Sequence, residues 1–164
     1  MKFFFSLFLL FGFLLAIYSC QSEVKVNVND SLTDTDITYD STLAKKLGAD
    51  DYGMHHYVMA FLKAGPNRDQ DSTTAAEIQK AHMANIKRLA EEGKLVVAGP
   101  FEDDGELRGI FIFDVATVDE AKTLTATDPA VQAGRLIMEL HPWYGSAAMM
   151  EINNLHKRVS KNSF

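Results

Sequence analysis

His82 is the histidine whose sequence position suggests chemistry. It lies on an apolar stripe with Ile78, Ile86 and Leu89, which recur at helical intervals. A ring placed there needs a hydrogen-bond partner, because an unpaired polar group in apolar surroundings costs about 1 to 3 kcal/mol. Two interpretations stay open at this point. His82 is either a core histidine bonded to a backbone carbonyl or a proton-transfer residue beside a pocket.

Asp128 is a candidate partner for His82. It follows the second predicted helix and precedes Pro129, on the face of the predicted sheet that the first helix also covers. A carboxylate bonded to one imidazole nitrogen fixes the tautomer and raises the basicity of the other nitrogen, so the pair could act as a general acid and base. Asp128 is equally suited to capping a short helix over 129–133 that Gly134 closes.

Six segments must position these two side chains. Apolar runs bounded by Gly, Pro and polar turns predict strands over 55–63, 95–98, 107–114 and 135–141. Capping boxes at Thr74–Glu77 and Thr117–Glu120 predict two helices, the first ending at Gly93 and the second near Thr127. The order strand, helix, strand, strand, helix, strand predicts an α+β fold of the ferredoxin-like βαββαβ type, with an antiparallel sheet and both helices on one face.

The second face of that sheet also carries apolar residues. In 57–61 and 111–113 apolar side chains point to both sides, so the face without helices needs a cover. A second copy of the sheet would provide one, and we favour this homodimer, a dimeric α+β barrel. The alternative cover is the C-terminal tail, 146–164, which has the apolar residues for a third helix.

The first 52 residues have a different composition from the rest. Residues 1–19 combine Lys2 with an apolar run, and 17–20 resemble a bacterial lipobox that ends at Cys20. We therefore expect a lipoprotein signal peptide over 1–19 and lipidation of Cys20, which would attach the chain to a bacterial membrane in the cell envelope, on the periplasmic or outer-surface side. An ordinary signal or an uncleaved anchor is the alternative. Polar residues over 20–52 predict a flexible tether before a domain over 53–145.

Composition excludes several classes of partner. The 164 residues carry 16 Lys and Arg against 22 Asp and Glu, a net charge of -6, which disfavours nucleic-acid binding. Cys20 is the single cysteine, so a multi-cysteine metal site within one chain is excluded. His55 and His56, with His82 or His141, are a weak metal candidate, since adjacent residues of a strand face opposite ways. We expect no metal and no cofactor.

Several short motifs resemble the YCII-related domain family. They are His82, Gly93-Lys94-Leu95, Ala98-Gly99-Pro100, Gly105, Thr127-Asp128-Pro129 with Gly134, and His141-Pro142-Trp143. The resemblance covers roughly 54–144. It implies a ferredoxin-like fold, dimeric barrels, and an active site at His82 and Asp128.

The function predicted from these residues is acid/base catalysis on a small cyclic or aromatic molecule. The resemblance implies isomerase or lyase chemistry of the dehydrochlorinase type, and we expect the substrate to lie near Tyr57, Gly99, Pro100 and Trp143. The alternative is a lipid-attached module that binds or senses a small molecule without changing it. A ligand recovered unchanged after long incubation would favour that alternative.

Overall fold

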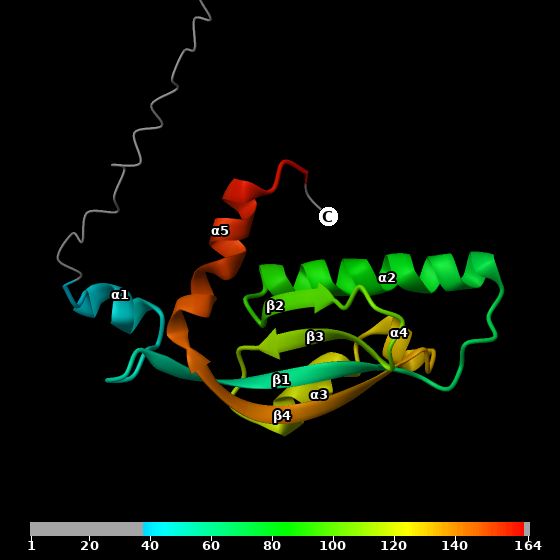
Figure 1. Cartoon of the computed structure of the whole chain (residues 1–164), viewed down its shortest axis with the longest axis horizontal. Coiled ribbons are helices and arrows are strands. Elements are labelled where there is room, and N and C mark those ends of the chain that lie inside the picture. The colour runs from blue at the N-terminus through cyan, green and yellow to red at the C-terminus, as the bar shows by residue number, and fades with distance from the viewer. Residues whose placement is uncertain (1–37, 163–164) are drawn as a thin grey trace, which may run out of the picture. The chain divides into compact units, whose positions relative to one another are not determined.

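The described part of the chain, residues 38–162, contains one four-stranded antiparallel sheet in this computed structural model (Figure 1). The strands are β1 (Met54–Ala64), β2 (Leu95–Pro100), β3 (Leu107–Phe113) and β4 (Leu136–Ser146), in the spatial order β2-β3-β1-β4. With helices after β1 and β3, this is the ferredoxin-like order, and the predicted α+β class is confirmed. The predicted signal peptide and Cys20 lie outside the described residues.

Helices α2 (Ser72–Glu91) and α3 (Val118–Thr125) cover one face of the sheet. Leu89 of α2 and Ala121 of α3 belong to the same buried cluster as Phe111 and Phe113 of β3. Each large apolar side chain buried in this way stabilises the fold by about 1.5 to 3 kcal/mol. This core fixes α2 against the sheet, and with it the side chains on the buried stripe of the helix.

The start of α2 and the end of β4 differ from the sequence prediction. Helix α2 is capped by Asp71, which accepts hydrogen bonds from Thr73 and Thr74 at 2.9 and 3.0 Å, so the predicted capping box at Thr74 is wrong. Strand β4 continues to Ser146 rather than ending before Pro142. Pro142 is tolerated because β4 is an edge strand, where a missing backbone N–H costs least.

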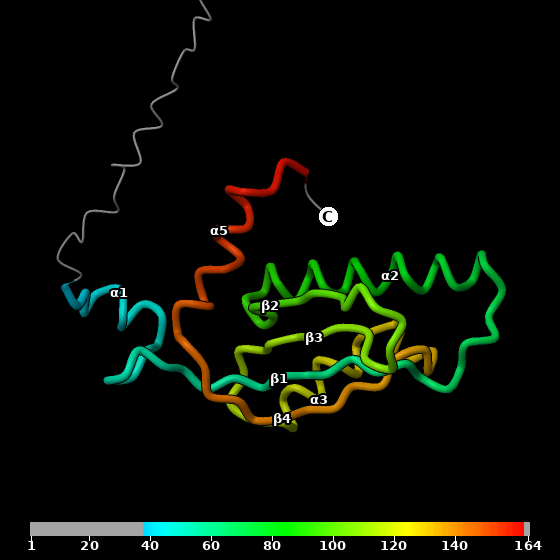
Figure 2. The backbone as a smooth tube through the Cα atoms, in the orientation of Figure 1, coloured from blue at the N-terminus to red at the C-terminus, as the bar shows by residue number. Residues whose placement is uncertain are grey.

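The C-terminal tail forms a short 3₁₀ helix, η1 (Ala147–Glu151), and helix α5 (Ile152–Val159). Met149 and Met150 of η1 pack against a cluster on the second face of the sheet, whose buried members are Tyr57, Val96 and Ile112. Helix α5 lies beside β2 (Figure 2). The Asn153 side-chain amide donates to the Leu95 carbonyl at 2.8 Å. The alternative cover considered from the sequence is therefore present over part of the second face.

The last part of the predicted tether is folded. Helix α1 (Ser41–Lys46) is capped by Asp40, and Leu47 after it is buried. The Lys46 ammonium donates to Glu151 at 2.6 Å, and Asp50 accepts from the backbone N–H of Met54. The prediction of a flexible tether as far as residue 52 is therefore wrong for its last part, which contains α1. The polar sequence hid a capping aspartate and one apolar residue, which suffice for a short helix held by contacts with the domain.

Within residues 38–162, every helix is too short or too polar to cross a bilayer.

Candidate functional site

Helix α2 has three buried residues: His82, Asn85 and Leu89. Their spacing of three and four residues places them on one face of the helix. Leu89 enters the apolar core, whereas the His82 ring lies nearly parallel to that of Phe111, with centroids 6.1 Å apart. The fold therefore holds His82 between the helix and the sheet, with 7% of the residue exposed.

Asp128 is fully buried at the junction between α3 and the short helix α4 (Pro129–Gln132). Its carboxylate accepts a hydrogen bond from the backbone N–H of Ala130 at 2.8 Å, and Pro129 occupies the first turn, where its missing N–H is no loss. Gly134 ends the segment with a φ of 68°, the left-handed conformation that glycine adopts easily. The predicted cap is therefore present.

His82 and Asp128 are hydrogen-bonded. Nδ1 of His82 lies 2.7 Å from Oδ2 and 2.9 Å from Oδ1 of Asp128. An ionised carboxylate only accepts, so Nδ1 carries the proton and Nε2 of the neutral ring keeps its lone pair. The capping role and the pairing of Asp128 coexist, because its two oxygens serve both partners. The core-histidine interpretation, in which a backbone carbonyl is the partner, does not describe Nδ1.

Hydrogen bonds among Arg88, Asn85 and Thr127 connect the two elements that carry this pair. Arg88 donates to the Asn85 amide oxygen at 2.7 Å and to the Thr127 hydroxyl at 3.0 Å, and Thr127 donates to Asn85 at 3.2 Å. These bonds tie α2 to the turn that carries Asp128. Asn85 was missed from the sequence, although its spacing of three residues from His82 was a usable signal.

His82 lines a cavity of about 840 Å³ between α2, the β2–β3 edge and α5. Apolar walls come from Leu62, Met83, Ile86 and Phe111. A volume of this size accommodates a small organic molecule. Gly99 and Pro100, which were predicted from the sequence to lie near the substrate, also line this cavity.

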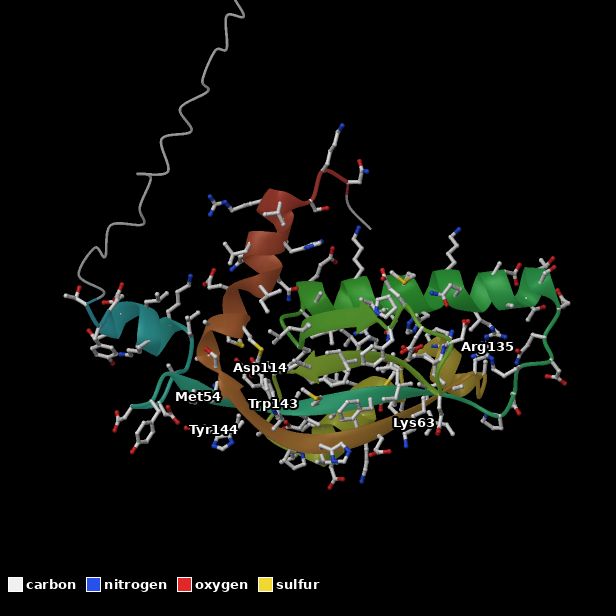
Figure 3. The ribbon with its side chains drawn as sticks, viewed as in Figure 1. Met54, Lys63, Asp114, Arg135, Trp143 and Tyr144 are labelled. Atoms are coloured by element: carbon white, nitrogen blue, oxygen red, sulfur yellow. The ribbon has the colours of Figure 1, made fainter. Side chains whose placement is uncertain are left out.

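Tyr57 and Trp143 lie on the other face of the sheet, and their prediction as neighbours of His82 is wrong. Their rings are 5.9 Å apart, and the Tyr57 hydroxyl donates to the Ser146 carbonyl at 3.1 Å. Figure 3 shows Trp143 well away from Arg135, which lines the cavity with His82. The reason is strand alternation: Val58, on β1 next to Tyr57, faces the helices, so Tyr57 faces away.

His55 and His56 do not converge. His55 contacts two acceptors, the Gly48 carbonyl at 3.0 Å from Nδ1 and the Asp114 carboxylate at 2.9 Å from Nε2. Both bonds require a doubly protonated ring. Burial lowers the pKa of His55, but the bonds to Asp114 and Gly48 outweigh this and raise the pKa above its ordinary value. The His56 ring instead packs against that of Tyr144, with the centroids 5.0 Å apart and the planes tilted by 38°.

Among residues 38–162, no group of three or more His, Cys, Asp or Glu side chains is placed to hold a metal ion.

Comparison with known proteins finds a matching family and similar solved structures. The model of the YCII-related domain matches residues 56–144, more than half of the chain. A 5-chloro-2-hydroxyhydroquinone dehydrochlorinase (TftG) from Burkholderia phenoliruptrix AC1100, solved with 2,5-dihydroxybenzoquinone, is similar at 20% identity and a TM-score of 0.41, over 54% of this chain and 93% of that one. No curated protein sequence matches the chain significantly.

Proposed function

Since the chain belongs to the YCII-related domain family, we propose that it is a small-molecule enzyme in which His82 and Asp128 form a general acid/base pair. The observation that carries this proposal is the 2.7 Å contact between a fully buried carboxylate and Nδ1 of a histidine on a cavity wall. Such a pair serves proton transfer, because the carboxylate orients the ring and stabilises the imidazolium that forms.

The reaction class follows from what this pair can do alone. Nε2 of His82 takes a proton from a carbon or oxygen of the substrate, and Asp128 stabilises the resulting imidazolium. Returning the proton to another carbon completes an isomerisation, whereas loss of a leaving group such as chloride from the adjacent carbon completes an elimination. Both are balanced without an oxidant or reductant. The substrate is a small cyclic or aromatic compound, for which the Phe111 ring beside His82 is a fitting wall.

Deuterium incorporation tests the proposal before a substrate is identified. The protein is incubated in D2O with a panel of small cyclic ketones, lactones and dihydroxybenzenes, and exchange or product formation is followed by NMR. We expect His82→Ala to lower the rate on any accepted compound by about 100-fold to 10,000-fold, the usual contribution of general acid/base catalysis.

The matched control is His141→Ala, which removes an imidazole that is half exposed and outside the cavity lining. This variant keeps the rate of the unmodified protein. Equal rates for the unmodified protein and His82→Ala would contradict the catalytic role. A compound that binds and is recovered unchanged, with His82→Ala altering affinity alone, would support the binding or sensing module instead.

We also propose that two copies pair through the second face of the sheet. Ile137 of β4 is 50% exposed, and Phe61 of β1, diagonal to it across the strand pair, is half-buried. Met59 packs against the cluster that η1 contacts. Light scattering should give the mass of a dimer for the mature domain, and Ile137→Glu should give a monomer. The same substitution at Val159, which is 81% exposed on α5, should leave the dimer intact. A monomer at all concentrations contradicts this pairing.

Attachment to a bacterial membrane through lipidated Cys20 is the last part of the proposal, and it rests on the sequence. Detergent-phase partitioning of the full chain should be lost in Cys20→Ser, whereas equal partitioning of both proteins contradicts lipidation.

A further inference from the structure

The cavity beside His82 is lined mainly by basic residues, although the chain as a whole is acidic. The protein carries a net charge of -6, yet the cavity is lined by six basic side chains and one acidic side chain, Glu91. The basic residues are Arg68, Lys87, Arg108, Arg135, Lys157 and Lys161. A concentration of one sign of charge in a concave site attracts ligands of the other sign. The cavity therefore selects against cations and in favour of anions.

The arginines of the cavity are bonded to uncharged oxygens. Arg68 donates to the Arg135 carbonyl at 3.2 Å, Arg135 to the Gln70 amide oxygen, and Arg108 to the Gly105 carbonyl at 3.1 Å. Among residues 38–162, none of the three lies within ion-pair distance of a carboxylate. Their positive charge is thus available to a ligand.

Four basic residues outside the cavity contact carboxylates of the protein. Lys46, Lys63, Arg88 and Lys122 each form an ion pair with a Glu or Asp. Acidic residues are in excess in this chain, so unpaired guanidinium groups are not a consequence of too few carboxylates. The fold instead keeps the cavity arginines away from the carboxylates of Asp and Glu side chains.

Of the arginines that line the cavity, Arg68 and Arg135 are connected by hydrogen bonds to the His82–Asp128 pair. Arg68 bonds to the backbone of Arg135, and the backbone N–H of Arg135 donates to the Ala130 carbonyl at 2.9 Å. Ala130 in turn donates its N–H to Asp128. These bonds fix Arg135, in the turn between α4 and β4, and Arg68, in the loop between β1 and α2, relative to the pair.

We infer that the cavity binds a small organic anion with an apolar body, whose carboxylate or similar oxyanion is held by Arg68 and Arg135 while the body lies against Phe111 and His82. This inference rests on the proposed function and names the substrate class of the same site. A guanidinium group suits it because its planar donors match a carboxylate in a two-bond contact. The apolar walls exclude small inorganic anions as the best ligands, since these would leave Leu62 and Ile86 without contacts.

Two fluorescent probes with the same aromatic body test the inference. Anilinonaphthalene sulfonate carries an anionic group, and phenylnaphthylamine lacks it. We expect the sulfonate to bind the unmodified protein at least about tenfold more tightly than the neutral probe, and to lose about tenfold in affinity in Arg68→Gln and in Arg135→Gln. The neutral probe should keep its affinity within about twofold, because its contacts are apolar.

Arg158→Gln is the matched control, because Arg158 is exposed on α5 and outside the cavity lining. Equal affinity of the two probes, or an equal loss in Arg158→Gln and the cavity variants, would overturn the inference. Should Arg135→Gln fail to fold, the salt dependence of binding to the unmodified protein decides: added salt must weaken the sulfonate and spare the neutral probe. Probe binding involves no proton transfer, so its outcome is independent of the deuterium-exchange test.

Discussion

Replacing Asp128 by Asn should move the His82 proton from Nδ1 to Nε2 while keeping a side chain of the same size and both of its hydrogen bonds. The amide oxygen of Asn can still accept from the Ala130 N–H, which lies 2.8 Å from Oδ1 in the native protein. The amide nitrogen then faces Nδ1 of His82 and donates to it, so Nδ1 must give up its proton and Nε2 must carry one. The nitrogen proposed to accept the substrate proton is thereby blocked.

Asp128→Ala provides the contrast that gives the magnitude. It removes the cap of α4, worth about 1 kcal/mol, and leaves the buried His82 Nδ1 unpaired, worth about 1 to 3 kcal/mol. The free energy of unfolding should therefore fall by about 2 to 4 kcal/mol. Asp128→Asn keeps a partner for both groups and should cost only about 1 kcal/mol, the difference between a charged and a neutral hydrogen bond.

Nitrogen NMR of labelled histidine reports which ring nitrogen is protonated, and urea denaturation reports stability. The reasoning requires the proton on Nδ1 in the native protein and on Nε2 in Asp128→Asn, with a loss of about 100-fold or more in any deuterium exchange. A native ring protonated on Nε2, or equal destabilisation by Asn and Ala, would refute it.

Two further perturbations test the fold around the site. The pKa of His55 is raised in the folded protein, so its stabilising effect is complete below about pH 6.5 and is lost as the pH rises through the folded value. His55→Gln should therefore lower the free energy of unfolding by about 1 kcal/mol at about pH 5.5 and by less at about pH 8.5, and an effect independent of pH would show that the bond to Asp114 is not charge-assisted. In Gly65→Ala the added Cβ would lie 2.2 Å from the Gly134 carbonyl oxygen, so thermal unfolding should reveal a loss of about 1 to 3 kcal/mol. Gly99→Ala meets no atom within 4 Å and should change stability by about 0.5 kcal/mol or less; a similar loss in both variants contradicts the close approach at Gly65.

The order of the elements could be predicted because each has a local signal. Gly93, with a φ of 71°, ends α2 as expected, and Thr117 caps α3 by accepting from the N–H of Glu120 at 3.1 Å. The pairing of His82 with Asp128 could also be anticipated, because a buried histidine demands a partner and a buried cap offers one. These inferences needed only local periodicity and the topology of the fold.

The cavity could not be predicted in the same way. Arg68 lies in a loop and Arg135 in a turn, where no periodicity indicates which way a side chain points. Tyr57 and Trp143 failed for a related reason. The order of the motifs along the chain does not show which face of the sheet a strand residue occupies. Because side chains alternate along β4, that of Trp143 lies on the face opposite the helices. The folded helix α1 depends on tertiary contacts of Leu47 and Lys46, which leave no pattern in a six-residue helix.

The electrostatics of the cavity connect the proposed chemistry with the proposed substrate class. Removing a proton from a carbon of an organic anion creates a second negative charge, which is unfavourable near the Asp128 carboxylate. Asp128 is fully buried behind the His82 ring, however, whereas Arg68 and Arg135 line the cavity itself. Positive groups fixed in place stabilise charge that develops during a reaction, at no cost of reorganisation. The same arginines that hold the substrate would therefore also favour its deprotonation, so charge-removing variants should lower the exchange rate on anionic compounds more than their loss of binding accounts for.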